Sequence, residues 1–225
     1  MKSLSMYLGS IIGNNDTCLE SILDDDDTFL DPERDRKTVV EEWIKDNYEF
    51  AGKLIIPDDF VVNCNFPIFV KNKHITSLTC GLFQWGTVYS FYCMDCDKLK
   101  NLEGAPKKTT DDFICKGCKS LETLEGAPEK VDGNFVCHLC NKLTNLIGSP
   151  KIVKECFACA YCDNLKSLEG ISGIIKGGIS CTNCKSLRDI THIKKVGDNI
   201  IIQNCPNITR STPEIDKKIR IYNEG

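Results

Sequence analysis

Hydrophobic and polar positions recur along the middle of the chain with a period of 22 residues. Two cysteines separated by two residues occur five times, and the first cysteines of successive pairs lie 22 residues apart. Phenylalanine or isoleucine precedes each pair by two positions, and leucine or isoleucine follows it three and six positions later. The pairs are Cys93/Cys96, Cys115/Cys118, Cys137/Cys140, Cys159/Cys162 and Cys181/Cys184. This register indicates a repeat protein whose stacked units complete one another's core.

Each unit predicts one strand followed by a return. Phe113-Ile114-Cys115 alternates as a strand with one buried face does. Gly126 and Pro128, within the recurring Glu-Gly-Ala-Pro, break the regular element and turn the chain back. Because a 22-residue unit is too short for a helical hairpin repeat, we expect a β-rich solenoid with one parallel strand per repeat.

The pattern Phe-x-Cys-x-x-Cys-x-x-Leu-x-x-Leu resembles the leucine-rich-repeat family in its cysteine-containing form, over about residues 67–209. The resemblance implies a buried Cys or Asn after each strand, stacked as a ladder. The chain departs from the family in placing cysteine at the second inward strand position, where leucine is usual. The Leu-Glu-Gly-Ala-Pro return also resembles little-studied repeat proteins of bacteriophages and gut bacteria, which have no settled activity. That similarity implies a phage-encoded protein.

The pattern continues past the cysteine pairs with changed residue types. Upstream, Ile75 and Leu78 match the leucine pair, which places Phe69 and Asn72 at the two cysteine positions. Downstream, Ile208 matches the first leucine, which places Ile202 and Cys205 at the two cysteine positions. Positions that accept phenylalanine, isoleucine or asparagine are typical of a packed core and a ladder rather than of a metal site.

The ends of the chain predict caps. Asp31 and Pro32 are a helix-start signal, and the apolar residues that follow form one stripe, so we expect a helix over 32–47. This helix and strand-like stretches at 54–56 and 60–62 make up an N-terminal cap at 31–66. Residues 1–30 are predicted to be an acidic arm and a candidate for disorder. Residues 67–225 are predicted to be the solenoid, closed by a capping strand at 219–222.

Composition and charge limit the environment. A net charge of -4 argues against a nucleic-acid binder with a strongly basic surface, so no nucleic acid is expected. No run of eighteen apolar residues predicts a transmembrane helix, and no signal-peptide cleavage pattern follows residues 1–12. We therefore expect reduced thiols and a cytoplasmic protein, in the host cytoplasm if the chain is phage-encoded.

The cysteines leave more than one explanation open. Two Cys-x-x-Cys pairs eighteen residues apart have the spacing of a four-cysteine zinc site, so a structural zinc protein is the main alternative. Five pairs cannot be grouped two by two, which favours cysteine as a small buried side chain. We expect no metal and no cofactor.

Catalytic motifs do not stand out in the sequence. Cys137 and His138 are neighbours, but adjacent strand residues point to opposite faces of a sheet. No nucleophile motif, phosphate-binding loop or zinc-protease histidine pair occurs. We expect the protein not to be an enzyme.

Function is therefore expected on the surface. Outward strand positions and the bend after each strand form columns that are apolar for an exposed sheet, which is typical of an interaction site, although β-propensity alone also favours such residues. The predicted partner-binding face consists of Tyr92, Met94, Ile114, Lys116, Val136, His138, Leu139 and Tyr161. The expected function is a non-enzymatic protein-protein interaction module with an unidentified protein partner. A surface adhesin or carbohydrate-binding solenoid is a further alternative.

Overall fold

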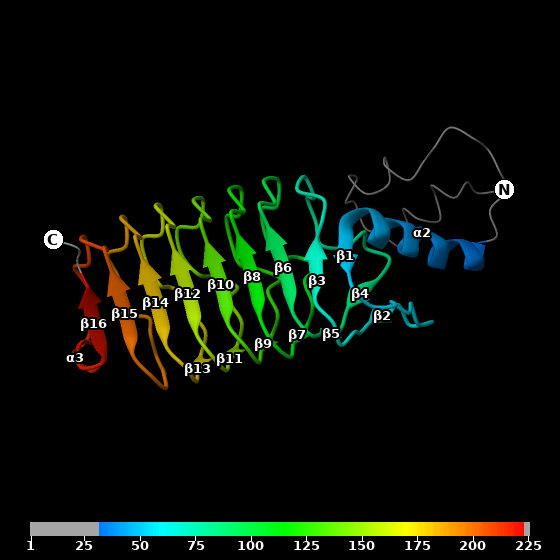
Figure 1. The fold of residues 1–225 in the computed structure, drawn as a ribbon. Coiled ribbons are helices and arrows are strands. Elements are labelled where there is room, and N and C mark those ends of the chain that lie inside the picture. The colour runs from blue at the N-terminus through cyan, green and yellow to red at the C-terminus, as the bar shows by residue number, and fades with distance from the viewer. Residues whose placement is uncertain (1–31, 223–225) are drawn as a thin grey trace.

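The computed structural model describes residues 32–222, which form an elongated solenoid of stacked turns (Figure 1). One sheet of nine strands, in the order β1-β3-β6-β8-β10-β12-β14-β15-β16, runs along its whole length. The bounds are β1 Tyr48–Phe50, β3 Ile68–Val70, β6 Phe91–Met94, β8 Phe113–Lys116, β10 Phe135–His138, β12 Phe157–Ala160, β14 Ile179–Thr182, β15 Ile200–Gln203 and β16 Ile219–Tyr222. Neighbouring strands are parallel except β1 with β3. The predicted β-rich solenoid with 22-residue repeats and parallel strands is confirmed.

A second and shorter sheet runs along the return side of the solenoid, where the sequence pattern predicted no strand. Its five strands, in the order β13-β11-β9-β7-β5, have two residues each. The bounds are β5 Thr87–Val88, β7 Lys108–Thr109, β9 Lys130–Val131, β11 Ile152–Val153 and β13 Ile174–Ile175. Two residues are too few for an alternation of polar and apolar positions to reveal a strand. Most turns therefore contribute to two sheets.

The N-terminal cap begins with helix α2, Pro32–Asn47, whose bounds are those predicted. Val40 and Ile44 of this helix are buried in the core. Strand β2, Val61–Val62, confirms part of the predicted stretch at 60–62 and pairs with β4, Gln84–Trp85, whereas residues 54–56 are not a strand. The acidic arm predicted at residues 1–30 lies outside the described residues.

At the C-terminal end a short helix α3, Pro213–Asp216, precedes the last strand, and Thr212 caps it by accepting a hydrogen bond from the Ile215 backbone. β16 lies where the capping strand was predicted and pairs with β15. No helix within residues 32–222 is long and apolar enough to cross a membrane.

The register at the start of the solenoid corrects one prediction. Strand pairing sets Ile68 opposite Phe91 and Phe69 opposite Tyr92, so the buried Val70, not Phe69, takes the first cysteine position. Phe69 faces outward and is 41% exposed. Asn72 is also exposed and does not join the ladder; its side-chain amide donates to the Asn47 side chain at 2.9 Å. The offset arises because this first turn is longer than the others, so a strict 22-residue alignment shifts its strand by one residue.

Stacked columns of identical side chains form the core. The rings of Phe91, Phe113 and Phe135 lie nearly parallel, with interplanar angles of 7° and 5° and centroid distances of 5.6 and 5.4 Å. Leu99, Leu121, Leu143, Leu165 and Leu187 form a second, fully buried column. Because equivalent residues repeat at each turn, every turn covers the apolar surface of the next.

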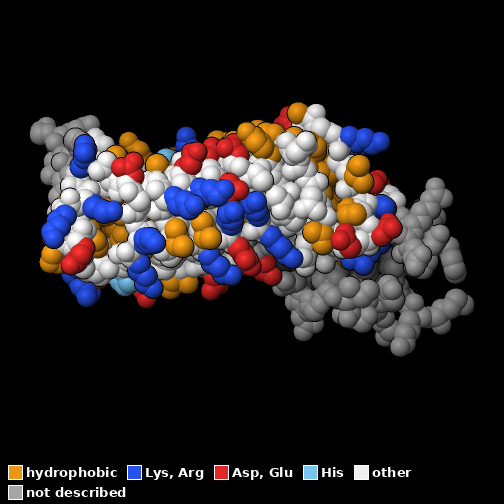
Figure 2. Space-filling view, turned by 90° about the horizontal axis from the view of Figure 1, so that it is seen from below, with side chains coloured by type: hydrophobic (Ala, Val, Ile, Leu, Met, Phe, Trp, Pro, Cys, Tyr) orange, Lys and Arg blue, Asp and Glu red, His pale blue; other side chains and the backbone are white. Residues whose placement is uncertain are grey.

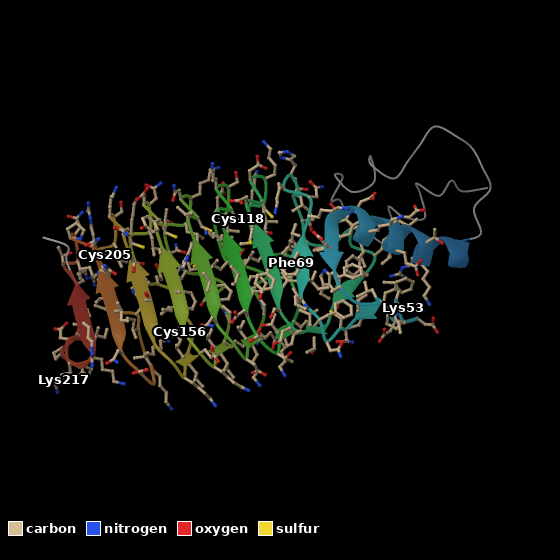
Figure 3. All side chains as sticks on the ribbon, viewed as in Figure 1. Lys53, Phe69, Cys118, Cys156, Cys205 and Lys217 are labelled. Carbon is tan, nitrogen blue, oxygen red and sulfur yellow. The ribbon has the colours of Figure 1, made fainter. Side chains whose placement is uncertain are left out.

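The cysteine pairs form two further columns inside the core. Cys93, Cys115, Cys137, Cys159 and Cys181 make the first column, and Cys96, Cys118, Cys140, Cys162, Cys184 and Cys205 make the second. Figure 3 shows Cys118 and Cys205 at corresponding ends of their strands, several turns apart. Ile202 pairs with Cys181 in register, as predicted. Within residues 32–222, no group of three or more His, Cys, Asp or Glu side chains is placed to hold a metal ion.

The second column binds each bend to the strand of the preceding turn. The Cys118 thiol donates to the carbonyl oxygen of Cys93 at 3.4 Å, and the Cys162 thiol donates to that of Cys137 at 3.2 Å. The thiols of Cys140, Cys184 and Cys205 likewise donate to carbonyl oxygens of the preceding turn. The acceptors are Cys115, Cys159 and Cys181, respectively. The sequence predicts a stacked ladder here, and the structure identifies the carbonyl oxygens that accept hydrogen bonds from its thiols.

Removing one ladder thiol is expected to weaken the solenoid more than exchanging a thiol of the first column. Cys140→Ala removes the donor to the Cys115 carbonyl and leaves space in the core, so the free energy of unfolding should fall by about 1 kcal/mol or more. Cys140→Ser keeps a donor, and Cys137→Val keeps a small apolar side chain, so each serves as a control. Urea denaturation measures the free energy of unfolding of each variant. Equal decreases for Cys140→Ala and Cys137→Val would contradict the prediction.

Candidate interaction face

The outward side of the nine-stranded sheet, here called the outer face, is the candidate site. Strand register places one residue of every strand in a single row across it, here called the central column. Its members are Glu49, Phe69, Tyr92, Ile114, Val136, Ala158, Ser180, Ile201 and Arg220. The five residues from Phe69 to Ala158 are aromatic or apolar without interruption. Since neighbouring strands lie about 4.8 Å apart, these side chains form a continuous apolar stripe along the solenoid axis.

The structure brings together six of the eight residues predicted for the face. Tyr92, Ile114 and Val136 lie in the central column. Met94, Lys116 and His138 form a parallel row in register at the ends of their strands. All six are only partly buried or exposed, in contrast to the cysteines between them.

Leu139 and Tyr161 lie on the rim of the outer face, at the first bend position after β10 and β12. Leu139 is 39% exposed and Tyr161 is 51% exposed. Both have positive φ, at 58° and 55°, in the left-handed region that disfavours bulky side chains. Equivalent positions in other turns hold residues better suited to this backbone: Asp95, Gly117, Asn183 and Asn204. Bulky residues kept in strained conformations are typical of functional surfaces.

Phe69 belongs to the face but was missed by the sequence pattern. Its ring stacks on that of Tyr92 with a centroid distance of 4.7 Å and an interplanar angle of 8° (Figure 3 labels Phe69). Ile68-Phe69-Val70 is apolar throughout, so alternation did not show which residue faces outward. A shallow depression surrounds this pair, lined by Glu49, Phe69, Val70, Lys71, Lys73, Tyr92 and Met94.

Two lysines beside the depression are held by the backbone. The Lys71 ammonium donates to the Lys45 carbonyl at 2.9 Å, and the Lys73 ammonium donates to the Met94 carbonyl at 2.8 Å. Glu49 also lines the depression. The N-terminal end of the face thus combines two aromatic rings with charged side chains of both signs.

His138 of the face and the adjacent Cys137 have pKa values shifted in opposite directions. Burial, together with the Lys116 charge, lowers the pKa of His138, which favours the neutral ring at pH 7. Burial raises the pKa of the adjacent Cys137 thiol, whose side chain lies inside the core. The two side chains therefore lie on opposite sides of the strand and do not form a nucleophile and base.

The fold defines the class of protein: a parallel β-solenoid of short repeats with internal cysteine columns. Comparisons with known protein families, curated proteins and solved structures find no match to this chain. Membership of the leucine-rich-repeat family therefore stays a prediction.

Proposed function

We propose that this protein is a non-enzymatic protein-binding module whose partner binds the outer face. The observation that carries the proposal is the uninterrupted apolar run of the central column from Phe69 to Ala158. A contiguous apolar patch exposed on a folded protein marks an interaction site. Tyrosine and other aromatic residues are enriched at protein interfaces, and Phe69 and Tyr92 contribute two aromatic side chains to the run.

The direction of the stripe favours a partner that lies along the solenoid axis. Five strands at about 4.8 Å spacing give a stripe roughly 20 Å long. An α-helix of about 13 residues has this length, and its turns repeat every ~5.4 Å, close to the strand spacing. An amphipathic helix laid across the strands would place one apolar side chain near each member of the run.

The aromatic geometry favours a protein over a carbohydrate. A sugar ring packs on an exposed aromatic face, and the stacking of Phe69 on Tyr92 covers one face of each ring. Ile114, Val136 and Ala158 offer aliphatic contacts with no fixed hydrogen-bonding group. These contacts suit the apolar side chains of a protein partner.

We also infer a cytoplasmic location, or the host cytoplasm for a phage-encoded chain. The support comes from the thiols of the two cysteine columns, since all eleven of them are free and buried. Free thiols persist in reducing compartments.

In the native protein, exposed and buried cysteines are expected to react with a thiol reagent at very different rates. Cys156 is exposed and should react quickly with a disulfide reagent, and the half-buried Cys64 should react more slowly. The buried thiols should react only as the chain unfolds, because the reagent cannot reach them, and burial also raises the pKa of the Cys137 thiol. Mass spectrometry of a time course identifies the labelled sites. Fast labelling of Cys137 or Cys140 would contradict the buried columns.

Replacing Leu139 by glycine is expected to raise the stability of the protein and to lower its affinity for the partner. Leu139→Gly relieves a left-handed conformation and should raise the free energy of unfolding by about 1 kcal/mol. It should also weaken partner binding, because the apolar side chain is lost. Val136→Gly, at an extended position, is the control and should lower stability. Thermal denaturation of both variants checks the signs, and a destabilised Leu139→Gly protein would contradict the strain.

The proposal is tested by capture from an extract of the cells that make the protein. The immobilised wild-type chain is compared with Ile114→Asp and with Lys107→Glu combined with Lys176→Glu, which changes exposed lysines on the return side. A protein that binds the wild type and the lysine variant, but not Ile114→Asp, supports the proposal. Identical captured sets from all three chains would overturn it.

A further inference from the structure

The return side of the solenoid carries a concentration of lysines that the proposed function does not use. Lys108 and Lys130 stand directly opposite each other on β7 and β9, and Ile152 and Ile174 continue the same row on β11 and β13. Further exposed lysines lie immediately before or after these strand positions: Lys107, Lys151, Lys154, Lys176 and Lys195. These nine residues are here called the lysine face. Figure 2, seen from the side on which Figure 1 places the short strands, shows Lys and Arg side chains gathered along the middle of the molecule.

Carboxylates neutralise only part of this charge. Asp132, whose side chain is 14% exposed, lies 3.4 Å from Lys108, 3.2 Å from Lys130 and 2.9 Å from Lys154. Partial burial opposes ionisation of Asp132, but hydrogen bonds from these three ammonium groups outweigh it and lower its pKa to about 2. Glu129 contacts Lys151 at 3.4 Å.

Positive charge therefore remains on the lysine face. Lys107, Lys176 and Lys195 have no ion-pair partner within residues 32–222. Like charges in register on neighbouring strands repel each other, so an anionic ligand would relieve this repulsion.

The same chain contains a segment of matching chemistry. Leu19-Glu20-Ser21-Ile22-Leu23 is followed directly by four aspartates, Asp24 to Asp27. Residues 1–31 contain seven acidic residues and one basic residue, whereas residues 32–222 contain 27 basic and 24 acidic residues. The segment thus combines aliphatic and acidic side chains, as the lysine face combines isoleucines and lysines.

We propose that residues 19–27 of one chain bind the lysine face of a second copy, with the aspartates on the lysines and the aliphatic residues on Ile152 and Ile174. The five-residue step from Asp27 to Pro32 spans at most about 18 Å. Because helix α2 extends from β1 away from the short strands (Figure 1), the aspartates do not reach the lysine face of their own chain. Four consecutive residues in an extended chain span about 10 Å, or two strand spacings of ~4.8 Å, so the aspartate run can reach lysines of successive turns. The outer face is a poorer site for this segment because it carries less positive charge. Between β6 and β14, the central column and the row that contains Met94 and His138 include one lysine, Lys116. A nucleic acid would also be attracted to the lysines, but its phosphates make no use of the exposed Ile174.

The first test uses the full chain and a carbodiimide, which joins lysine amines to carboxylates in direct contact. Peptide mass spectrometry should find Asp24–Asp27 joined to lysines of the lysine face, and 500 mM NaCl should reduce these products at least tenfold. In an equal mixture of ¹⁵N-labelled and unlabelled chains, these products should join labelled to unlabelled peptides, because the contact forms between two copies. Products confined to one chain would overturn the proposal. Products that join the aspartates mainly to lysines elsewhere, or no products, would overturn the proposal.

The second test measures affinity with the lysine face unoccupied. A full chain carrying Asp24→Asn, Asp25→Asn, Asp26→Asn and Asp27→Asn is titrated against a fluorescent peptide of residues 17–29 and followed by anisotropy. Adding Lys107→Glu and Lys176→Glu should weaken binding at least tenfold, and neither lysine has an ion pair to lose. The matched control is Lys98→Glu with Lys119→Glu, exposed lysines of the bends.

Two results would refute the assignment. One is equal affinity in the lysine-face and control variants. The other is tighter binding of a 20-nucleotide single-stranded DNA than of the peptide, lost with the same lysine substitutions, which would assign the lysine face to nucleic acid.

Discussion

Replacing Phe135 by alanine is expected to lower the free energy of unfolding by about 3–5 kcal/mol. Its ring is fully buried and lies between those of Phe113 and Phe157, at centroid distances of 5.4 and 5.1 Å. Alanine would leave a cavity that the neighbouring turns cannot fill, because hydrogen bonds of both sheets fix their spacing. Urea denaturation followed by circular dichroism measures the loss.

The matched control for this prediction is the same substitution at Phe69. That side chain is partly exposed and its removal opens no closed cavity, so Phe69→Ala should cost about 1 kcal/mol or less. Equal losses at Phe69 and Phe135 would contradict the assignment of one phenylalanine to the surface and the other to the core.

Placing aspartate in the middle of the central column is expected to abolish most of the affinity for the partner. Ile114→Asp should weaken binding roughly thirtyfold or more, since truncating an interface hot spot costs about 2 kcal/mol and a buried unpaired charge adds to this. The fold should survive, because Ile114 points away from the core. Isothermal titration with the captured partner gives the affinity, and thermal denaturation verifies folding.

A charge at a polar position of the same row provides the control. Ser180→Asp introduces the same carboxylate on β14, two strands beyond Val136 and outside the apolar run. It should change affinity by less than about threefold. Equal effects of Ile114→Asp and Ser180→Asp would show that charge on the sheet, rather than loss of the apolar stripe, governs binding.

The repeat register is what made the fold predictable from sequence. Phenylalanine, two cysteines and two leucines recur at fixed spacing, and each takes the same position in successive turns, so five units determine the long sheet and its core columns. The short sheet was not predictable in this way. Lys108-Thr109 and Ile152-Val153 occupy equivalent strands yet share no polar pattern, because their pairing depends on backbone contacts between turns rather than on side-chain type.

Residues of the candidate face were predictable in strands whose sequence shows which residues point into the core and which point outward. They were not predictable in strands that are apolar throughout. Tyr92, Ile114 and Val136 each stand between two buried residues, which identified them as outward. Phe69 stands between two aliphatic residues in a turn of different length, so the period misplaced it. The strain at Leu139 was not predicted, although the aligned positions of other turns hold Asp95, Gly117 and Asn183, residue types that favour the left-handed region.

Site-specific photo-crosslinking tests the central claim most directly. Benzoylphenylalanine is placed at position 136 on the outer face or at position 152 on the return side, and each chain is irradiated in an extract of the cells that make the protein. We expect one foreign protein to be joined to the chain modified at Val136 and not to the chain modified at Ile152. Crosslinking of the same foreign protein at both positions, or of a foreign protein at position 152 alone, would contradict the assignment of the outer face as the binding surface.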